Sequence, residues 1–182
     1  VANRTRFDKE AGIDNKRYHL TLLAENMQGY KNLIKLTTAA NLEGYYYKPR
    51  VDKDLLRMYS EGVIALSGCF GGELARALRS RDHDRAVLIA REYQEIFGKE
   101  NYYIEIMHKP EIEGHDEVEN ALVALARELD IPLVATHDSH YLHKDDKKAH
   151  ETLLGIQTGG VGGADDGMKF EFDASFISTK EA

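Results

Sequence analysis

Asp138 and His140 stand two residues apart, directly after the apolar run Ile131–Ala135. This run predicts a short buried strand, and in extended or turn geometry alternate side chains point the same way. A carboxylate and an imidazole placed in this way can bind one metal ion. Ligands of α/β proteins collect at the carboxyl ends of strands, which is where this pair falls. The stretch therefore predicts a metal site.

Two further predicted strands end in residue types that bind metals. The strand at Val63–Ser67 is followed by Cys69, and the strand at Tyr102–Met107 is followed by His108. If these strands are parallel, their carboxyl ends lie on one face with the Asp138–His140 pair. Thiolate, imidazole and carboxylate groups together suit zinc, iron or manganese. Two or three closely spaced ions of this kind would hold a phosphate ester and activate a water molecule for attack.

Each candidate also has an ordinary structural interpretation. A single cysteine such as Cys69 is commonly a small core residue, and His108 could be a surface residue in a turn. The run Tyr45–Arg50 could stack on nucleic-acid bases, with Lys48 and Arg50 as phosphate or DNA contacts. It could equally be an amphipathic loop packed on the domain. Five other histidines are interpreted as exposed or helix-surface residues: His83, His115, His137, His143 and His150.

Predicted strands and helices alternate along the chain, which favours parallel strands joined by right-handed crossovers. A strand at Tyr18–Ala24 comes first, and we expect about four strands with no internal repeat. Apolar spacing and capping residues predict helices at Gly29–Leu42, after Asp52, from about Glu73, and at Asp84–Phe97, Asp116–Leu129 and Asp145–Gln157. The fold class is therefore α/β, as one unit that is either part of a barrel or an open sheet.

The composition is that of a soluble globular protein, with 182 residues, 42% hydrophobic and 30% charged. The single cysteine excludes an internal disulfide and fits a reducing cytoplasm. No apolar run is long enough to cross a bilayer, so we expect no membrane partner. A net charge of −7 argues against tight, independent binding of nucleic acid. Val1 and Ala2 look like the end of a strand, and we expect the chain to be a piece of a longer protein.

Several segments, taken together, resemble one protein family. They are Tyr18–Ala24, Glu43–Arg50, Leu66–Cys69, Asp138–Tyr141 and Gly155–Gly159. In these segments the chain resembles the polymerase-and-histidinol-phosphatase (PHP) domain of the bacterial DNA polymerase III alpha subunit. The resemblance runs in order over nearly the whole chain, and the tyrosine-rich segment is specific to this polymerase branch.

The resemblance implies a distorted seven-stranded β/α barrel, similar to a TIM barrel, with up to three metal ions at its mouth. By matching position, the ligands in this chain would be His19, Cys69, Asp138 and His140. His137 stands where relatives commonly have asparagine, and it could add a ligand or a hydrogen bond. The family's other ligands lie in an earlier part of the domain, so residues 1–182 would form a single, incomplete PHP domain without its first strands.

The position of His19 strains this interpretation. His19 stands near the start of its predicted strand, whereas the other candidate ligands follow the ends of theirs. Either the strand starts earlier or the barrel is irregular at this point.

The resemblance leaves two functions open. The first is metal-dependent hydrolysis of phosphodiesters, as a 3′–5′ proofreading exonuclease inside a replicative DNA polymerase. The second is a non-catalytic module that stabilises the polymerase and docks a separate proofreading subunit. The implied partners are DNA, through the parent polymerase, and other replisome subunits. We expect no efficient catalysis from these 182 residues alone, because four ligands cannot hold three ions.

Overall fold

The computed structural model describes residues 1–107 and 112–157. They form two compact units: residues 1–106 with 118–134 make up the first, and the remaining described residues make up the second. Each unit is described by itself. No helix in the described part of the chain has the length and apolar character needed to cross a membrane.

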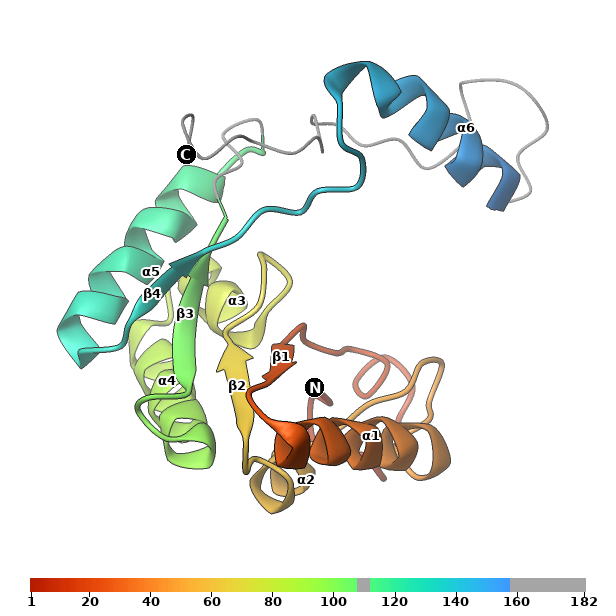
Figure 1. The fold of residues 1–182 in the computed structure, drawn as a ribbon. Coiled ribbons are helices and arrows are strands. Elements are labelled where there is room, and N and C mark those ends of the chain that lie inside the picture. The colour runs from red at the N-terminus through yellow and green to blue at the C-terminus, as the bar shows by residue number, and fades with distance from the viewer. Residues whose placement is uncertain (108–111, 158–182) are drawn as a thin grey trace. The chain divides into compact units, whose positions relative to one another are not determined.

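Strands and helices alternate as the sequence predicts (Figure 1). The strands are β1 (Thr21–Ala24), β2 (Val63–Leu66), β3 (Tyr102–Ile106) and β4 (Leu133–Ala135). The helices are α1 (Met27–Leu42), α2 (Lys53–Met58), α3 (Glu73–Arg79), α4 (His83–Phe97), α5 (His115–Leu129) and α6 (Lys147–Gln157), with a 3-10 turn, η1, at Lys144–Asp146. Four predicted helices, those at α1, α4, α5 and α6, begin within two residues of the observed positions and end where predicted.

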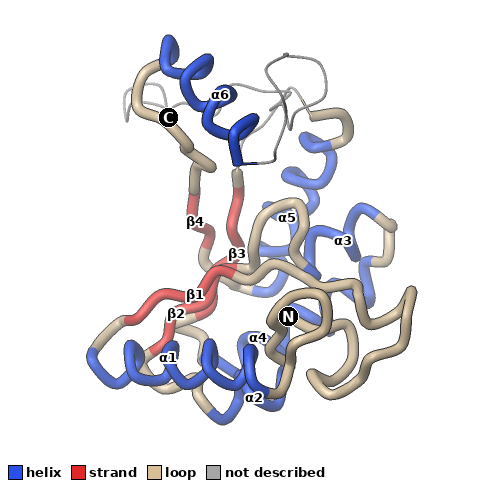
Figure 2. The backbone as a smooth tube through the Cα atoms, turned by 90° about the vertical axis from the view of Figure 1, so that its right-hand side faces the viewer, coloured by secondary structure: helices blue, strands red, loops and turns tan. Residues whose placement is uncertain are grey.

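The four strands form one sheet in the order β1-β2-β3-β4. Strands β2 and β3 are parallel, with Ala65 opposite Tyr102 and Leu66 opposite Tyr103. This mostly parallel α/β sheet confirms the predicted fold class and is the arrangement expected for part of a PHP barrel. Helix α4 packs against β2 and β3, while α1 lies beside β1 and β2 (Figure 2).

Strand β1 departs from the prediction, because it runs antiparallel to β2, with Thr21 opposite Leu66 and Ala24 opposite Val63. The cause is a close contact that holds the end of β1 at the start of β2. The Glu25 amide donates to the Gly62 carbonyl over 2.9 Å. Gly62 has a φ of +67°, and a Cβ on it would lie 2.5 Å from Oδ1 of Asn26, the residue that caps α1. Only glycine fits this turn without strain.

The core lies around the two central strands. Val63, Ala65, Tyr102 and Ile104 are fully buried, and they pack with apolar residues of the surrounding helices. The outer strands β1 and β4 are mostly exposed. The prediction of a buried strand at 131–135 is therefore wrong about its burial. Strand β4 has only three residues, and the side chain of Leu133 is 38% exposed. As the last strand in the order it has one neighbour among the described residues, which leaves much of its surface uncovered by them.

Candidate metal centre

His19 and Cys69 lie side by side, although 50 residues separate them, with 3.3 Å between Nδ1 of His19 and Sγ of Cys69. The direction of β1 explains this pairing. Because β1 is antiparallel to β2, the residues that precede β1 lie beside the carboxyl end of β2, which Cys69 follows. The His19 amide also donates to the Gly71 carbonyl over 3.3 Å. His19 therefore lies at the carboxyl end of β2, although it precedes β1 in the sequence.

The loop that carries Cys69 depends on glycine at its closest approach to His19. Gly68 has a φ of +85°, and a Cβ on it would lie 2.5 Å from the His19 carbonyl oxygen. A Cβ on Gly71 would lie 3.2 Å from Nδ1 of the His19 ring. The loop thus lets the backbone approach the ring closely. His19 is exposed and Cys69 is half-buried, so an ion from solvent could reach both.

A buried carboxylate on β3 was not anticipated from the sequence. Glu105 is 5% exposed, and its Oε2 lies 3.4 Å from the Thr21 hydroxyl, which donates to it. Its backbone amide donates to the hydroxyl of Ser67, at the end of β2. The sequence feature that could have indicated this buried carboxylate is Glu105 itself, the single charged residue of the apolar strand Tyr102–Ile106.

Asp138 and His140 come together in the second unit, with 3.2 Å between Oδ1 of Asp138 and Nε2 of His140. Their side chains are 45% and 36% exposed respectively. Nδ1 of His137 lies 2.7 Å from the Ser139 hydroxyl, so this ring has a local partner. The alternate spacing of Asp138 and His140 thus brings their side chains together as the sequence suggested.

Both pairs have the separation that a shared metal ion requires. In a tetrahedral zinc site, sulfur and nitrogen ligand atoms lie roughly 3.5 Å apart, and oxygen and nitrogen atoms roughly 3.4 Å apart. The observed distances are 3.3 Å for His19–Cys69 and 3.2 Å for Asp138–His140. Imidazole with thiolate or carboxylate is also a donor set typical of zinc and iron. Each pair therefore has the donor types and the spacing to supply two of the ligands that a metal ion needs.

One histidine predicted to be exposed or on a helix surface is in fact buried, whereas His150 is half-buried on α6. His115 is only 6% exposed, because it begins the inward stripe that continues through Val118, Leu122 and Leu125 of α5. The ring of His150 in α6 lies 5.3 Å from that of His140, measured between ring centroids. By contrast, His83 remains exposed and pairs with Glu128 over 3.1 Å.

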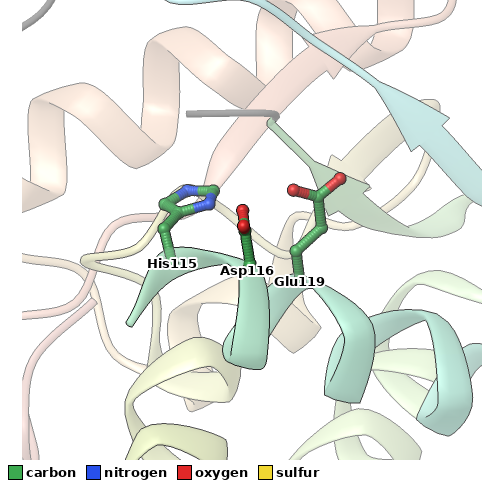
Figure 3. A group of neighbouring side chains, drawn as sticks. All are labelled: His115, Asp116 and Glu119. Carbon is green, nitrogen blue, oxygen red and sulfur yellow. The ribbon is translucent and has the colours of Figure 1, made fainter. Parts of the chain in front are cut away.

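The first turns of α5 bring three residues that could bind a metal close together, which Figure 3 shows as His115, Asp116 and Glu119. One ligand atom from each lies within 4.8 Å of the others. The sequence signal was the His-Asp-x-x-Glu spacing, since residues four apart share a helix face. His108, the candidate after β3, lies outside the described residues.

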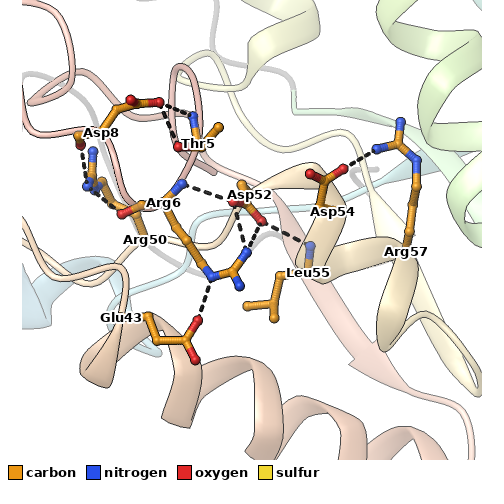
Figure 4. Close-up of polar contacts among 9 residues, drawn as sticks. All are labelled: Thr5, Arg6, Asp8, Glu43, Arg50, Asp52, Asp54, Leu55 and Arg57. Carbon is orange, nitrogen blue, oxygen red and sulfur yellow. Dashed lines mark hydrogen bonds and ion pairs between the residues drawn. The ribbon is translucent and has the colours of Figure 1, made fainter.

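The two basic candidates differ in their surroundings. Arg50 is 2% exposed, and its guanidinium donates to four backbone carbonyls. Figure 4 shows those of Arg6 and Asp8, and the other two belong to Asp14 and Gly44. These bonds favour an internal role that fixes the N-terminal loop and disfavour a phosphate contact. Lys48 is exposed, so a phosphate contact at Lys48 stays a prediction.

Carboxylates hold the same loop in place. The hydrogen bond from Arg4 is the main cause that lowers the pKa of Asp14 to about 2. Burial alone would raise the pKa of Asp52, but hydrogen bonds from the amides of Arg6 and Leu55, together with the Arg6 guanidinium, outweigh it and lower that pKa (Figure 4). The loop that leads to His19 is therefore held by ionised carboxylates.

Comparison with known proteins gives consistent results. The PHP domain family matches residues 4–109, which include His19 and Cys69 but not Asp138 and His140. The chain is 41% identical to the DNA polymerase III subunit alpha of Deinococcus radiodurans, over 97% of this chain and 13% of that protein. It is 39% identical to the protein of the same name from Thermus aquaticus, over 100% of this chain and 15% of the relative. It is 40% identical to the Treponema pallidum protein of this name, over 100% of this chain and 16% of that protein.

The chain thus spans about 13–16% of the length of these curated relatives. The family match covers more than half of the 182 residues, including strands β1 to β3 and the loop that carries Cys69. The chain therefore belongs to the PHP domain family.

Proposed function

We propose that the chain is the PHP module of a replicative DNA polymerase and takes part in DNA replication. The support is the sequence identity of about 40% to proteins named DNA polymerase III subunit alpha, which extends over 97–100% of this chain in three of them. In this proposal the 182 residues act within a longer cytoplasmic polypeptide, in which DNA and other replisome subunits are the partners.

The module's own role in this proposal is to bind divalent metal ions. The observation that carries it is the contact between His19 and Cys69, because two ligand types far apart in sequence meet at a metal-compatible distance of 3.3 Å. Asp138 and His140, with His137 as an additional candidate, would bind metal as well, and the intact domain would hold up to three ions. Zinc, manganese and iron are the candidate metals.

The chemistry that such a centre supports is hydrolysis of phosphodiesters. A bound metal ion lowers the pKa of water and neutralises charge on a phosphate, which suits a 3′–5′ proofreading exonuclease. In this chain, His19, Cys69, Asp138 and His140 would hold the metal, and the exposed Lys48 would contact a phosphate of the DNA strand.

The test is a 3′–5′ nuclease assay, with measurement of bound metal, on the full-length polypeptide. Asp138→Ala should lower both metal content and nuclease rate. Asp84→Ala removes an exposed carboxylate from the first turn of α4 and serves as the matched control. Absence of bound transition metal from the unmodified protein, or an unchanged nuclease rate in Asp138→Ala, would overturn the catalytic proposal.

The net charge of −7 favours a second candidate, a non-catalytic module that docks a proofreading subunit. An acidic surface suits a protein partner better than DNA, whose backbone repels it. Binding of the proofreading subunit should then survive Asp138→Ala. Loss of that binding in a variant that remains folded would contradict the docking role.

A further inference from the structure

The ring of His150 in α6 packs against two residues of the segment that carries the Asp138–His140 pair. Its centroid lies 5.3 Å from the His140 ring, with the planes tilted by 34°. It also lies 5.5 Å from the Tyr141 ring, with a tilt of 44°. His150 is half-buried, and its Nε2 is shielded from solvent.

A tight turn before α6 brings His150 to this place. The His143 amide donates to Oδ2 of Asp146 over 3.2 Å, and the Asp146 amide donates to the His143 carbonyl over 2.9 Å. The chain reverses there, through η1, and α6 starts at Lys147. His150 therefore stands in the first turn of the helix, where it can reach back to a residue ten positions earlier.

We propose that His150 is a positioning residue, which holds the His140 ring in the orientation that metal binding requires. This inference rests on the proposed metal centre. A histidine that binds a metal has to present one ring nitrogen along a fixed direction, and neighbouring groups usually fix that direction. Ring packing by His150, which itself packs against Tyr141, restricts rotation of His140, whose side chain is otherwise 36% exposed.

His150 acts through His140 and not as a ligand in this proposal. In the described residues, the group of three whose ligand atoms converge is the one on α5, and His150 is not part of it. The ring-to-ring contact is therefore the property to test. A phenylalanine at position 150 would keep a flat ring there and remove both nitrogens, whereas alanine would remove the ring.

The experiment follows Zn²⁺ binding to the 182-residue chain by NMR of the His140 ring, assigned with His140→Ala. His150→Ala should weaken Zn²⁺ binding by about tenfold or more, as outer-shell changes commonly do. His150→Phe should restore affinity to within a few fold of the unmodified chain. His143→Ala, at an exposed histidine of the preceding turn, should leave the affinity unchanged.

The possible results distinguish failure of the positioning role of His150 from failure of the proposed metal centre. If the unmodified chain shows no Zn²⁺ response at His140, the metal centre itself fails and the positioning role falls with it. If Zn²⁺ binds and Asp138→Ala weakens it, but His150→Ala binds as tightly as the unmodified chain, only the positioning role is overturned. A His150→Phe variant as weak as His150→Ala would also overturn it. Circular dichroism of each variant checks that the helical content of the chain is unchanged.

Discussion

At the scale of single residues, the candidate centre depends on the glycines of the neighbouring loop as much as on the candidate ligands. His19 and Cys69 meet because Gly68 and Gly71 leave room beside the His19 backbone and ring. The ligand types could be predicted from the sequence, but their pairing could not be derived from strand periodicity. The burial of Arg50 could not be derived from the sequence pattern either, because the carbonyls that accept its hydrogen bonds lie 6 to 44 residues away along the chain.

Gly68→Ala should lower the free energy of unfolding by more than the strain of a positive φ alone would. The added Cβ would meet the His19 carbonyl oxygen at 2.5 Å, and a φ of +85° is strained for alanine. Gly12→Ala is the matched control, since Gly12 has a φ of +82° and a Cβ added to it would have no neighbouring atom within 4 Å. Urea unfolding should show a loss of about 1 kcal/mol for Gly12→Ala and clearly more for Gly68→Ala. Equal losses would show that the close approach to His19 is unimportant.

Asp14 should make stability depend on pH at the acidic end. Its pKa is lowered from 3.8 to about 2, chiefly by the hydrogen bond from Arg4. A carboxyl whose pKa is lower in the folded state stabilises the fold above its unfolded pKa, and this contribution is lost as pH falls toward 2. The difference in free energy of unfolding between the unmodified chain and Asp14→Asn should therefore shrink between pH 5 and pH 2. Urea unfolding across this range measures it, and a difference that stays constant would contradict the assignment.

At the scale of secondary-structure elements, apolar runs predicted where strands and helices occur but not which way every strand runs. The alternation of strands and helices favours parallel neighbours, and β2 and β3 follow that rule. Strand β1 does not, because the contact at Gly62 fixes its far end beside the start of β2. That contact involves backbone atoms, which leave no apolar periodicity in the sequence. The reversed direction is what places His19 next to Cys69.

Helix α3, which follows the Cys69 loop, should depend on its buried leucine. Leu74 is 1% exposed and packs in the core, whereas Leu88 of α4 is 71% exposed. Leu74→Ala should lower the free energy of unfolding by about 2–5 kcal/mol, since it leaves a cavity. Leu88→Ala should change it by no more than about 0.5 kcal/mol. Denaturant unfolding of the two variants decides this, and a small loss for Leu74→Ala would show that α3 is loosely packed.

At the scale of the whole molecule, the chain matches only a small part of its relatives. Its relatives are about six to eight times longer, as the 13–16% coverage shows. Its net charge of −7 provides no general attraction for DNA. The PHP fold could be recognised from the sequence because its motifs are specific. The function of this copy could not, because four ligands are compatible with both a catalytic and a docking role.

The 182-residue chain by itself should show no efficient nuclease activity. The four proposed ligand residues cannot hold three ions, and weak attraction for DNA would limit substrate binding further. A nuclease assay with added Zn²⁺ or Mn²⁺ should therefore give a rate far below that of the full-length polypeptide. Full activity from the 182 residues would contradict this expectation and would mean that fewer ions suffice.

Co²⁺ binding is the measurement that shows whether His19 and Cys69 bind one metal ion together. A thiolate bound to Co²⁺ gives a sulfur-to-metal charge-transfer band, and Cys69 is the chain's single cysteine. We predict that the band appears with the unmodified chain, disappears in Cys69→Ser, weakens strongly in His19→Ala and persists in His83→Ala. Absence of the band from the unmodified chain, or an undiminished band in His19→Ala, would contradict the account.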